Sequence, residues 1–569
     1  MENKIFTMSE DGKSEYCCNV VRIGEILPID GADRIGQTFV NVSESIVVRK
    51  DQVKEGDLMF YASNETELNH GFLSANNLFD IASCELNANY EDIKTMLDAA
   101  NNAKLDARIL RHYMPRIGRL IKRFEKAEDD LERTKIQNEM YSVLCELSDK
   151  AAFAKREGET IKETYERIGN NINVNEEVYN DMRAQAKTHV GFFNKYGRVK
   201  RIKLKGIPSM GYLFTLDELI KWKPELADAD INMEELLNKD FDTIGGELFV
   251  KVYIPRVKEP AQRGRSGNKA DKKLKAFDRI IPGTFHFHYD TDPLGKNVWK
   301  INPTDKVFIT NKLHGTSAIF SNIPVKNPKK INIFKRLWNL VTPENWHFID
   351  YVVENDLLCS SRKVIKNSTI NKGVTGGFYN HDIWTEYGEL LKPYIPDGVT
   401  VYGEICGYID SEKMIQKGYD YCCKPGESFL MPYRMTSLLP DGSTYEWEVS
   451  DVMDWTEKLM IVLPDKIKNL DLMYHGTLAD LYPDIEIGSH WHEEVYQRLA
   501  IEERFGMEEN EPMCQNEVPR EGFVLRIEGD KTAEAFKCKC QAFLSRESEM
   551  ISEIASGKGE LDGEMAETY

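Results

Sequence analysis

Two kinds of hydrophobic pattern alternate along the chain. In residues 16–80, β-branched, aromatic and other apolar side chains form short runs such as YCCNVVRIGEILPI and GDLMFYAS, separated by Gly, Asp and Pro. Such runs between turn-forming residues are typical of β-strands. The pattern predicts a small β-barrel or sandwich in this part of the chain.

From residue 81 to 190 the pattern becomes helical. Ile117, Ile121, Phe124 and Leu131 recur at spacings that place them on one face of an α-helix. The Lys and Arg residues of RIGRLIKRFEK are of the type that contacts RNA, but a solvated outer helix face is the simpler explanation. We expect a helical insertion, to which the sequence assigns no function.

Strand-like sequence resumes at 191–255, in GFFNKYGRVKRIKLKGIPSMGYLF and GELFVKVYIP, with a predicted helix near 215–224. The helical segment is therefore expected to interrupt one β domain made of residues 1–80 and 191–255. Within it, KYGRVKRIKLKG holds six basic residues, and Lys200 and Lys203 are candidates for contact with RNA phosphates.

Residues 256–275 are rich in Gly, Pro and Lys without apolar periodicity, which is typical of a mobile, basic linker. Beyond them, 276–545 alternates strand-like runs with few long helices, and an acidic tail follows at 546–569. This pattern predicts a second, larger α+β domain. The fold class expected for the chain is therefore α+β.

Length, apolar content and cysteine spacing limit the class of protein to which these domains belong. The 569 residues are too many for one ordinary core, and no run of about 18 apolar residues appears that could span a bilayer, so no membrane association is expected. The N-terminus lacks the basic-then-apolar order of a secretory signal, and the eleven cysteines match no paired zinc-ligand spacing. Reduced thiols in a cytoplasmic protein are expected.

The net charge of −19 argues against general attraction to nucleic acid, although such binding depends on where positive charge is clustered. The sequence gives no evidence of a partner protein.

Four short elements carry candidate chemistry. KLHG begins with Lys312 where one apolar run ends and another starts; VTVYGEICGY places Glu404 near a strand end; and REGFVLRIEG places Glu521 just before a strand. In EAFKCKCQAF, Lys537 and Lys539 lie on one side of a strand because alternate residues share a face. Each element alone is more simply a turn, a strand end or a solvated edge.

In this order, the four elements resemble motifs I, III, IV and V of the covalent nucleotidyltransferases, the superfamily of ATP-dependent ligases and mRNA-capping enzymes. KLHGT is similar to the Lys-x-His-Gly-Thr of the second class of phage RNA ligases, rather than to the Lys-x-Asp-Gly common in DNA ligases. The N-terminal half resembles the RNA ligase branch in which an OB domain precedes the catalytic domain.

This resemblance implies an OB-like β-barrel followed by a catalytic domain of antiparallel sheets with flanking helices. It implies ATP and Mg²⁺ or Mn²⁺ as cofactors, and RNA with 3′-hydroxyl and 5′-phosphate ends as substrate, sealed through a lysyl-AMP intermediate in RNA repair. Lys312 would be the nucleophile, Glu404 would bind the ribose and Glu521 the metal, and Lys537 and Lys539 would contact the reacting phosphate.

The resemblance extends to four further positions. His314 and Gly315 would belong to the nucleotide site, Arg362 in CSSRKVIKN would contact a phosphate, and Tyr433 would stack on the adenine. The chain departs from the usual pattern in its helical insertion and in Asn311, which stands before the lysine where an acidic or other residue is often found.

Three alternatives stay open. A DNA ligase and an mRNA-capping guanylyltransferase use the same lysyl-nucleotide chemistry, because the four motifs fix neither the nucleotide nor the acceptor. A non-catalytic RNA-binding protein with this fold would be expected to have lost Lys312 or the Lys537 and Lys539 pair, and the sequence retains all three.

Overall fold

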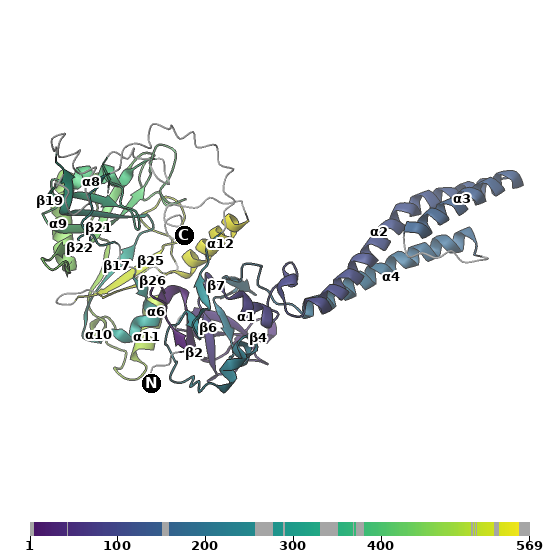
Figure 1. The fold of residues 1–569 in the computed structure, drawn as a ribbon, viewed down its shortest axis with the longest axis horizontal. Coiled ribbons are helices and arrows are strands. Elements are labelled where there is room, and N and C mark those ends of the chain that lie inside the picture. Colours follow the sequence, from purple (N-terminus) through teal and green to yellow (C-terminus); the bar gives the residue numbers. More distant parts are fainter. Residues whose placement is uncertain are drawn as a thin grey trace, which may run out of the picture.

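The computed structural model describes residues 5–42, 44–150, 159–255, 277–287, 291–329, 351–367, 369–370, 381–501, 505, 507, 509–528 and 534–556. These residues form two β-rich bodies that lie side by side, and a long helical arm projects from one of them (Figure 1). Helices and largely antiparallel sheets occur together, which confirms the predicted α+β class. The predicted linker at 256–275 and most of the tail lie outside the described residues.

The first body, residues 5–89 and 189–255, is built from strands on both sides of the arm in the sequence. β6 (Leu58–Ala62) pairs with β2 (Cys18–Arg22) and with β11 (Tyr212–Phe214). β7 (Thr66–Leu68) likewise pairs with β8 (Arg198–Val199) and β14 (Val250–Val252). The two segments therefore share their sheets.

The other elements of the first body are β1 (Phe6–Thr7), β3 (Leu27–Ile29), β4 (Ala32–Val40), β5 (Glu44–Arg49), β9 (Ile202–Leu204), β10 (Ile207–Ser209), β12 (Thr243–Ile244), β13 (Glu247–Leu248), α1 (His70–Ala75), α5 (Leu216–Trp222) and the 3-10 turns η1 (Ser14–Tyr16), η2 (Cys84–Leu86) and η3 (Pro224–Asp228).

Aromatic side chains fill the core of the first body. Phe60 and Phe214 stack with ring centroids 5.3 Å apart, and Phe72 meets Phe214 edge-on at the same separation. In the described part of the first body the strands form sheets of two or three strands, and no closed barrel is present there. The OB-like barrel therefore stays a prediction.

The arm consists of α2 (Tyr90–Lys126), α3 (Asp130–Lys150) and α4 (Ile161–Thr188) (Figure 1). α4 begins with a capping box, in which Thr160 and Glu163 satisfy each other's backbone N–H groups. The apolar faces of the three helices pack together around a core that includes Leu110, Ile117 and Ile168. None of the helices in the described ranges is long and apolar enough to cross a membrane.

The second body, residues 277–556, contains two five-stranded sheets. The first has the order β16-β26-β25-β17-β24, antiparallel except for the parallel pair β16 and β26, and the second has the order β19-β18-β21-β22-β23. The elements are β15 (Phe277–Asp278), β16 (Asp292–Pro293), β17 (Lys306–Lys312), β18 (Thr316–Pro328), β19 (Tyr351–Ser360), β20 (Thr369–Ile370), β21 (Val399–Gly407), β22 (Ser428–Leu438), β23 (Thr444–Glu446), β24 (Leu472–Thr477), β25 (Gly522–Ile527), β26 (Glu534–Lys539), α6 (Leu294–Asn297), η5 (Val298–Lys300), α8 (Ile383–Leu391), α9 (Val449–Val462), α10 (Leu478–Leu481), α11 (Trp491–Ile501) and α12 (Gln541–Ala555).

Strand register aligns three of the chemical elements in the first of these sheets. Lys312, the last residue of β17, is opposite Gly522 at the start of β25, and Gly522 is opposite Lys539 at the end of β26. Gly522 has φ +146, and a Cβ there would lie 1.9 Å from the carbonyl oxygen of Cys538, so only glycine fits. The register therefore brings Lys312, Lys539 and the preceding Glu521 to one rim of the sheet.

The two bodies are joined through α12. The guanidinium of Arg198 donates to Glu65 Oε2 at 2.8 Å, and Ser548 Oγ on α12 donates to Glu65 Oε1 at 2.7 Å. Burial raises the pKa of Glu65 even though Arg198 opposes the shift. A second contact, in which Lys296 Nζ donates to the carbonyl oxygen of Ser14 at 2.7 Å, holds the η1 turn against the second body.

Candidate functional site

The site centres on the ion pair between Lys312 and Glu521. The Nζ atom of Lys312 lies 2.7 Å from Oε1 of Glu521. The lysine side chain is 23% exposed and the glutamate side chain 3% exposed. The amine is therefore within reach of a ligand at the rim, while its carboxylate partner is shielded from water.

The loop after Lys312 crosses from one five-stranded sheet to the other. The backbone N–H of Gly315 donates to Oε1 of Glu404 on β21 at 3.0 Å, and Gln416 donates to the Gly315 carbonyl at 2.7 Å. A Cβ on Gly315 would lie 2.4 Å from the carbonyl oxygen of Ile405, so a larger residue would push the loop away from β21. Glu404 thus fixes the loop that presents Lys312.

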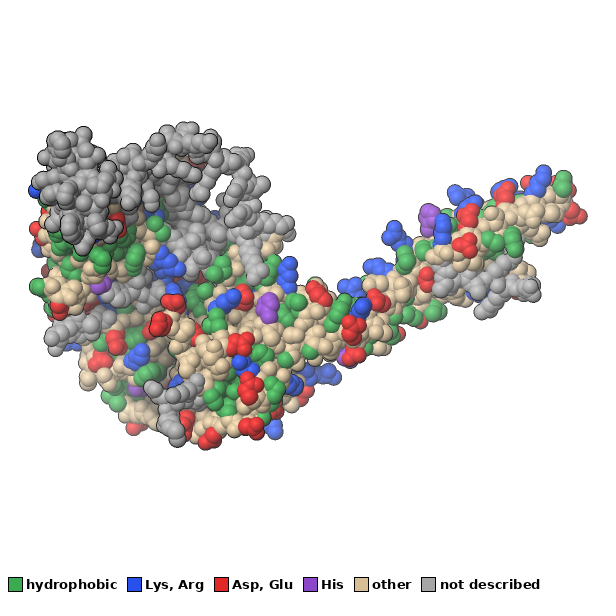
Figure 2. Space-filling view, viewed as in Figure 1, with side chains coloured by type: hydrophobic (Ala, Val, Ile, Leu, Met, Phe, Trp, Pro, Cys, Tyr) green, Lys and Arg blue, Asp and Glu red, His purple; other side chains and the backbone are tan. Residues whose placement is uncertain are grey.

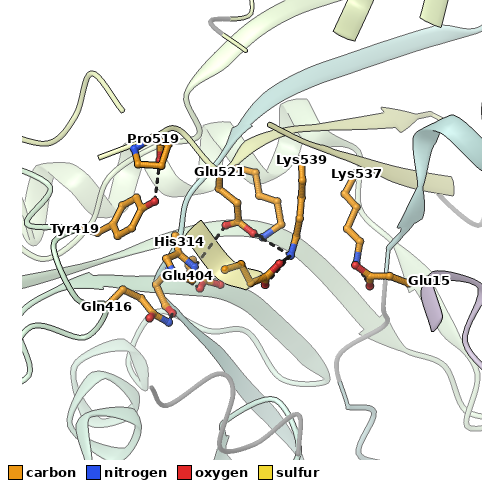
Figure 3. A network of polar contacts seen from close by, with 12 residues as sticks. Glu15, His314, Glu404, Gln416, Tyr419, Pro519, Glu521, Lys537 and Lys539 are labelled. Carbon is orange, nitrogen blue, oxygen red and sulfur yellow. Dashed lines mark hydrogen bonds and ion pairs between the residues drawn. The ribbon is translucent and has the colours of Figure 1, made fainter. Parts of the chain in front are cut away.

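His314 is held by its backbone and by its ring. Its N–H donates to the hydroxyl of Tyr421 at 2.6 Å, and its ring meets those of Tyr419 and Phe543 edge-on, at 4.9 and 5.0 Å between centroids. Nδ1 of His314 lies 3.8 Å from Oε2 of Glu521, and the two side chains face each other in Figure 3. The histidine therefore packs against Glu521 and two aromatic rings.

Each of the two lysines on β26 has a carboxylate partner (Figure 3). Lys539 Nζ lies 3.2 Å from Glu547 on α12 and 4.0 Å from Oε1 of Glu521. Lys537 Nζ lies 2.5 Å from Oε2 of Glu15. The partners offset the repulsion between two like charges that share one strand face.

Glu15 reaches the lysines from the η1 turn of the first body. Burial alone would raise its pKa, but Lys537 and Lys539, with the guanidinium of Arg362, lower it to about 2. Because the ordinary value is 4.5, the charged contact is complete above about pH 4.5 and is lost as the pH falls toward 2. Three cations therefore surround one carboxylate at neutral pH.

Arg362 and Tyr433 lie at the edge of the same cluster. Arg362 follows β19 and is close enough to act electrostatically on both Glu15 and Tyr433. Burial raises the pKa of the Tyr433 hydroxyl, and the nearby Glu404 carboxylate adds to the shift. The structure thus places Tyr433 beside Glu404 and Arg362 near the lysines.

Two sequence candidates lie elsewhere. Lys200 and Lys203 are exposed at and beside β9 of the first body, and in the described part of the chain they show no contact with the Lys312 cluster. Their neighbour Arg201 instead donates to Gln541 on α12 at 2.8 Å.

Asn311 lies in the protein core and not among the side chains of the site. Its side chain points into the core, away from Lys312, and donates to Glu511 at 3.2 Å. Burial raises the pKa of Glu511. Asn311 is therefore explained by packing.

Sequence reasoning did not identify Glu15, Gln416 or Glu547. Glu15 and Gln416 meet the site only through long-range packing, and Glu547, eight residues after Lys539, reaches it because α12 folds back beside β26. The described residues contain no group of three or more His, Cys, Asp or Glu side chains that could hold a metal by themselves. A magnesium site built on one or two carboxylates together with substrate phosphates does not need such a group.

Comparisons with known proteins give similarity to solved structures only. A scan against protein-family models finds no matching family, and a search of curated proteins finds no match. A variant of the Naegleria gruberi RNA ligase with AMP and Mn aligns over 93% of this chain and 98% of its own, at 14% identity and a TM-score of 0.43. The same ligase with PPi aligns over 94% and 99%, at 13% identity and a TM-score of 0.42. This level of identity and TM-score is too low to establish a function, which has to be inferred from the side chains of the site.

Proposed function

We propose that the chain is an ATP-dependent RNA ligase in which Lys312 forms a covalent bond to AMP. The observation that carries this proposal is the cluster at the rim of the sheet. There Lys312 forms an ion pair with Glu521, and Lys539 lies near the same carboxylate; Lys537 is on the same strand as Lys539, β26. A reachable amine beside two further cations and a shielded carboxylate is the arrangement that attack on a nucleotide phosphate requires.

Lys312 must lose a proton before it can attack. The ordinary lysine pKa is about 10.4, and the carboxylate of Glu521 favours the charged ammonium. With substrate bound, the ammonium groups of Lys537 and Lys539 favour the neutral amine, and a cation held by Glu521 would add to this effect. The ion pair between Lys312 and Glu521 is therefore the resting arrangement of the site.

In the first step, the neutral Nζ of Lys312 attacks the α-phosphorus of ATP. A nitrogen–phosphorus bond forms, the bond from the α-phosphorus to the bridging oxygen breaks, and pyrophosphate leaves. The amine proton passes to solvent. Lys537 and Lys539 stabilise the charge that develops on the phosphate oxygens.

In the later steps, an RNA 5′-phosphate oxygen attacks the lysyl-AMP phosphorus and joins AMP to the RNA end. The nitrogen–phosphorus bond breaks, and Lys312 takes up a proton from solvent and leaves as the amine. The 3′-hydroxyl of the adjoining strand then attacks the 5′-phosphorus, loses its proton and expels AMP. The product is a phosphodiester, and repair of broken RNA is the role we propose for it.

The nucleotide would occupy the surface between Glu404 and Tyr433. Glu404 would accept hydrogen bonds from the ribose hydroxyls, Tyr433 would stack on the adenine, and Arg362 would bind a phosphate. His314 and Gly315 would shape the same site through the Lys312 loop. The chain therefore offers one group for each part of ATP.

Glu521 would hold Mg²⁺ or Mn²⁺ together with substrate phosphates and water. The described residues fit such an ion, because Glu521 is a shielded carboxylate at the rim where phosphate would bind. When bound, the ion would neutralise charge on the phosphate oxygens.

The first body would hold the RNA as a split OB-like domain, residues 1–80 and 191–255, ahead of the catalytic domain at 276–545. Lys200 and Lys203 are exposed there and would contact phosphates. Residues 81–190 would be an insertion in this domain.

The proposal is tested by incubation with ATP, Mg²⁺ or Mn²⁺, and nicked duplexes made of RNA/RNA, RNA/DNA or DNA/DNA with a 5′-phosphate and a 3′-hydroxyl at the nick. We expect sealing of RNA 3′-hydroxyl ends. Sealing restricted to DNA would favour a DNA ligase, and covalent labelling from GTP alone would favour a capping guanylyltransferase. Absence of any covalent adduct would leave a non-catalytic RNA-binding protein.

Glu15→Gln is expected to lower the KM for ATP. The carboxylate of Glu15 neutralises Lys537, 2.5 Å away, where an anionic phosphate would bind. Its removal frees that cation, and we expect a few-fold effect, on the order of 1 kcal/mol for a partly exposed pair. The measurement is the rate of adenylate formation against ATP concentration.

The matched control for this variant is Glu10→Gln, an exposed residue of the same N-terminal segment with the same change in charge. It should leave the KM unchanged. A KM that rises in Glu15→Gln would contradict competition between the carboxylate and the phosphate, and would mean that Glu15 helps to bind the nucleotide.

A further inference from the structure

One face of α2 carries an exposed row of basic side chains. Between residues 104 and 126 there are eight Lys or Arg residues and two acidic residues, a balance of +6 in a chain whose net charge is −19. We define the basic face as Arg108, Arg119, Lys122 and Lys126, with His112 on the same side; all five are exposed. Figure 2 shows Lys and Arg side chains along the margin of the arm.

The spacing of these residues sets them in one row. They are separated by four, seven, three and four positions, which are whole numbers of helical turns to within a fraction of a residue. The opposite face of α2 packs against α3 and α4 through Leu110, Ile117 and Leu120. The row therefore faces away from the core of the arm.

Other basic residues of α2 are paired at the flanks. Arg116 lies 3.1 Å from Glu146 and Arg123 lies 2.8 Å from Glu139, both on α3, while Arg111 pairs with Glu176 on α4. Among the residues that the structure describes, no carboxylate lies within 4.0 Å of Arg108, Arg119, Lys122 or Lys126. The charges of these flanking residues are neutralised by carboxylates within the arm. The charges of the basic face are therefore available to a binding partner.

The chemistry of the row favours a polyanion. Between residues 108 and 126, none of the described large hydrophobic side chains is exposed. Protein interfaces usually have an aromatic or apolar centre, which this face lacks. A line of guanidinium and ammonium groups without such a centre is the arrangement that binds a phosphate backbone regardless of base sequence.

We propose that the basic face of α2 binds the phosphate backbone of the RNA substrate at a distance from the ligation site. This inference rests on the proposed RNA ligase function. α2 has 37 residues and is about 55 Å long, and the basic face begins roughly 27 Å along it. The arm points away from the second body, so only RNA that extends well past the break reaches the face (Figure 1).

The test compares two variants with equal charge changes. In the first, Arg108→Gln, Arg119→Gln and Lys122→Gln are combined on the basic face. In the control, Lys135→Gln, Lys162→Gln and Lys187→Gln are combined on exposed positions of α3 and α4. Glutamine keeps helix propensity, and circular dichroism checks that both arms fold. Affinity is measured against salt for a short duplex of about 16 base pairs and for one several times longer.

We expect the basic-face variant to bind the long RNA at least about tenfold more weakly, with a salt slope reduced by about 2, because each phosphate contact contributes roughly 0.7–0.9. Its affinity for the short duplex and its adenylate formation from ATP alone should stay at the control level. Long-RNA affinity equal to that of the control would overturn the proposal. An equal loss on short and long RNA would also overturn it.

The two proposals fail separately. A wild-type chain that forms no adenylate but whose long-RNA binding depends on the basic face would reject the ligase function and retain the RNA contact. A chain that forms the adenylate and seals RNA, yet binds long RNA independently of the basic face, would retain the ligase function and reject the contact.

Discussion

Lys312→Ala is expected to abolish ATP-dependent sealing of RNA completely. The variant lacks the amine that would bond to AMP. Lys539 shares the rim, but it and Lys537 come from β26 and pair with Glu547 and Glu15, and we assign both to the phosphate rather than to attack. Sealing of RNA that already carries AMP on its 5′-phosphate should survive, because that step does not use the lysine as a nucleophile. The measurement is product formation from each of the two substrates.

The fold of this variant should be preserved. A side chain at a rim contributes little to a core, and Lys539, 4.0 Å away, still offsets the charge of Glu521. Lys306→Ala, at the exposed start of the same strand β17, is the matched control and should seal both substrates. ATP-dependent sealing by a folded Lys312→Ala protein would refute the assignment of the nucleophile.

Glu521→Gln is expected to slow adenylate formation by about 10²–10³-fold, the range seen when one preorganised electrostatic group is removed from a site. Glutamine has nearly the same shape and can still accept a hydrogen bond from Lys312, 2.7 Å away in the native site. It cannot supply the negative charge that we assign to the metal. A lower rate of adenylate formation in Glu521→Gln therefore indicates that Glu521 binds the metal, because glutamine preserves its contact with Lys312.

The readout for this variant is the rate of adenylate formation against Mn²⁺ concentration. A metal-binding role predicts that the rate recovers in part at high Mn²⁺. Glu528→Gln, just beyond the other end of β25, is the matched control and should behave as wild type. Full activity of Glu521→Gln at low metal would contradict the role and leave Glu521 as a support for Lys312.

The sequence was sufficient to predict the α+β class and the local elements of the site. Lys312 and Glu521 stand at strand boundaries that the hydrophobic pattern marks, and alternation along β26 sets Lys537 and Lys539 on one face. Glu404 was expected at a strand end, but β21 continues past it to Gly407. Their roles remain proposals. The structure adds the register that aligns Lys312, Gly522 and Lys539, which no single motif contains.

Other features could not be predicted because they depend on long-range packing. Glu15 meets Lys537 only because Lys296 and the contact between Glu65 and Ser548 hold the two bodies together. Asn311, which the sequence marks as a departure beside the nucleophile, proves to be a buried partner of Glu511. The basic row of α2 is visible in the sequence, but only the packing of α3 and α4 shows that the carboxylates of the described residues pair with its flanks and not with the row.

The central claim is tested most directly by mapping the covalent adduct. The protein is incubated separately with ATP and with GTP in Mg²⁺ or Mn²⁺, digested under conditions that preserve phosphoramidates, and analysed by mass spectrometry. We predict AMP on the Lys312 peptide after incubation with ATP, and no adduct after incubation with GTP. AMP on another residue, GMP on Lys312, or no adduct with either nucleotide would contradict the account.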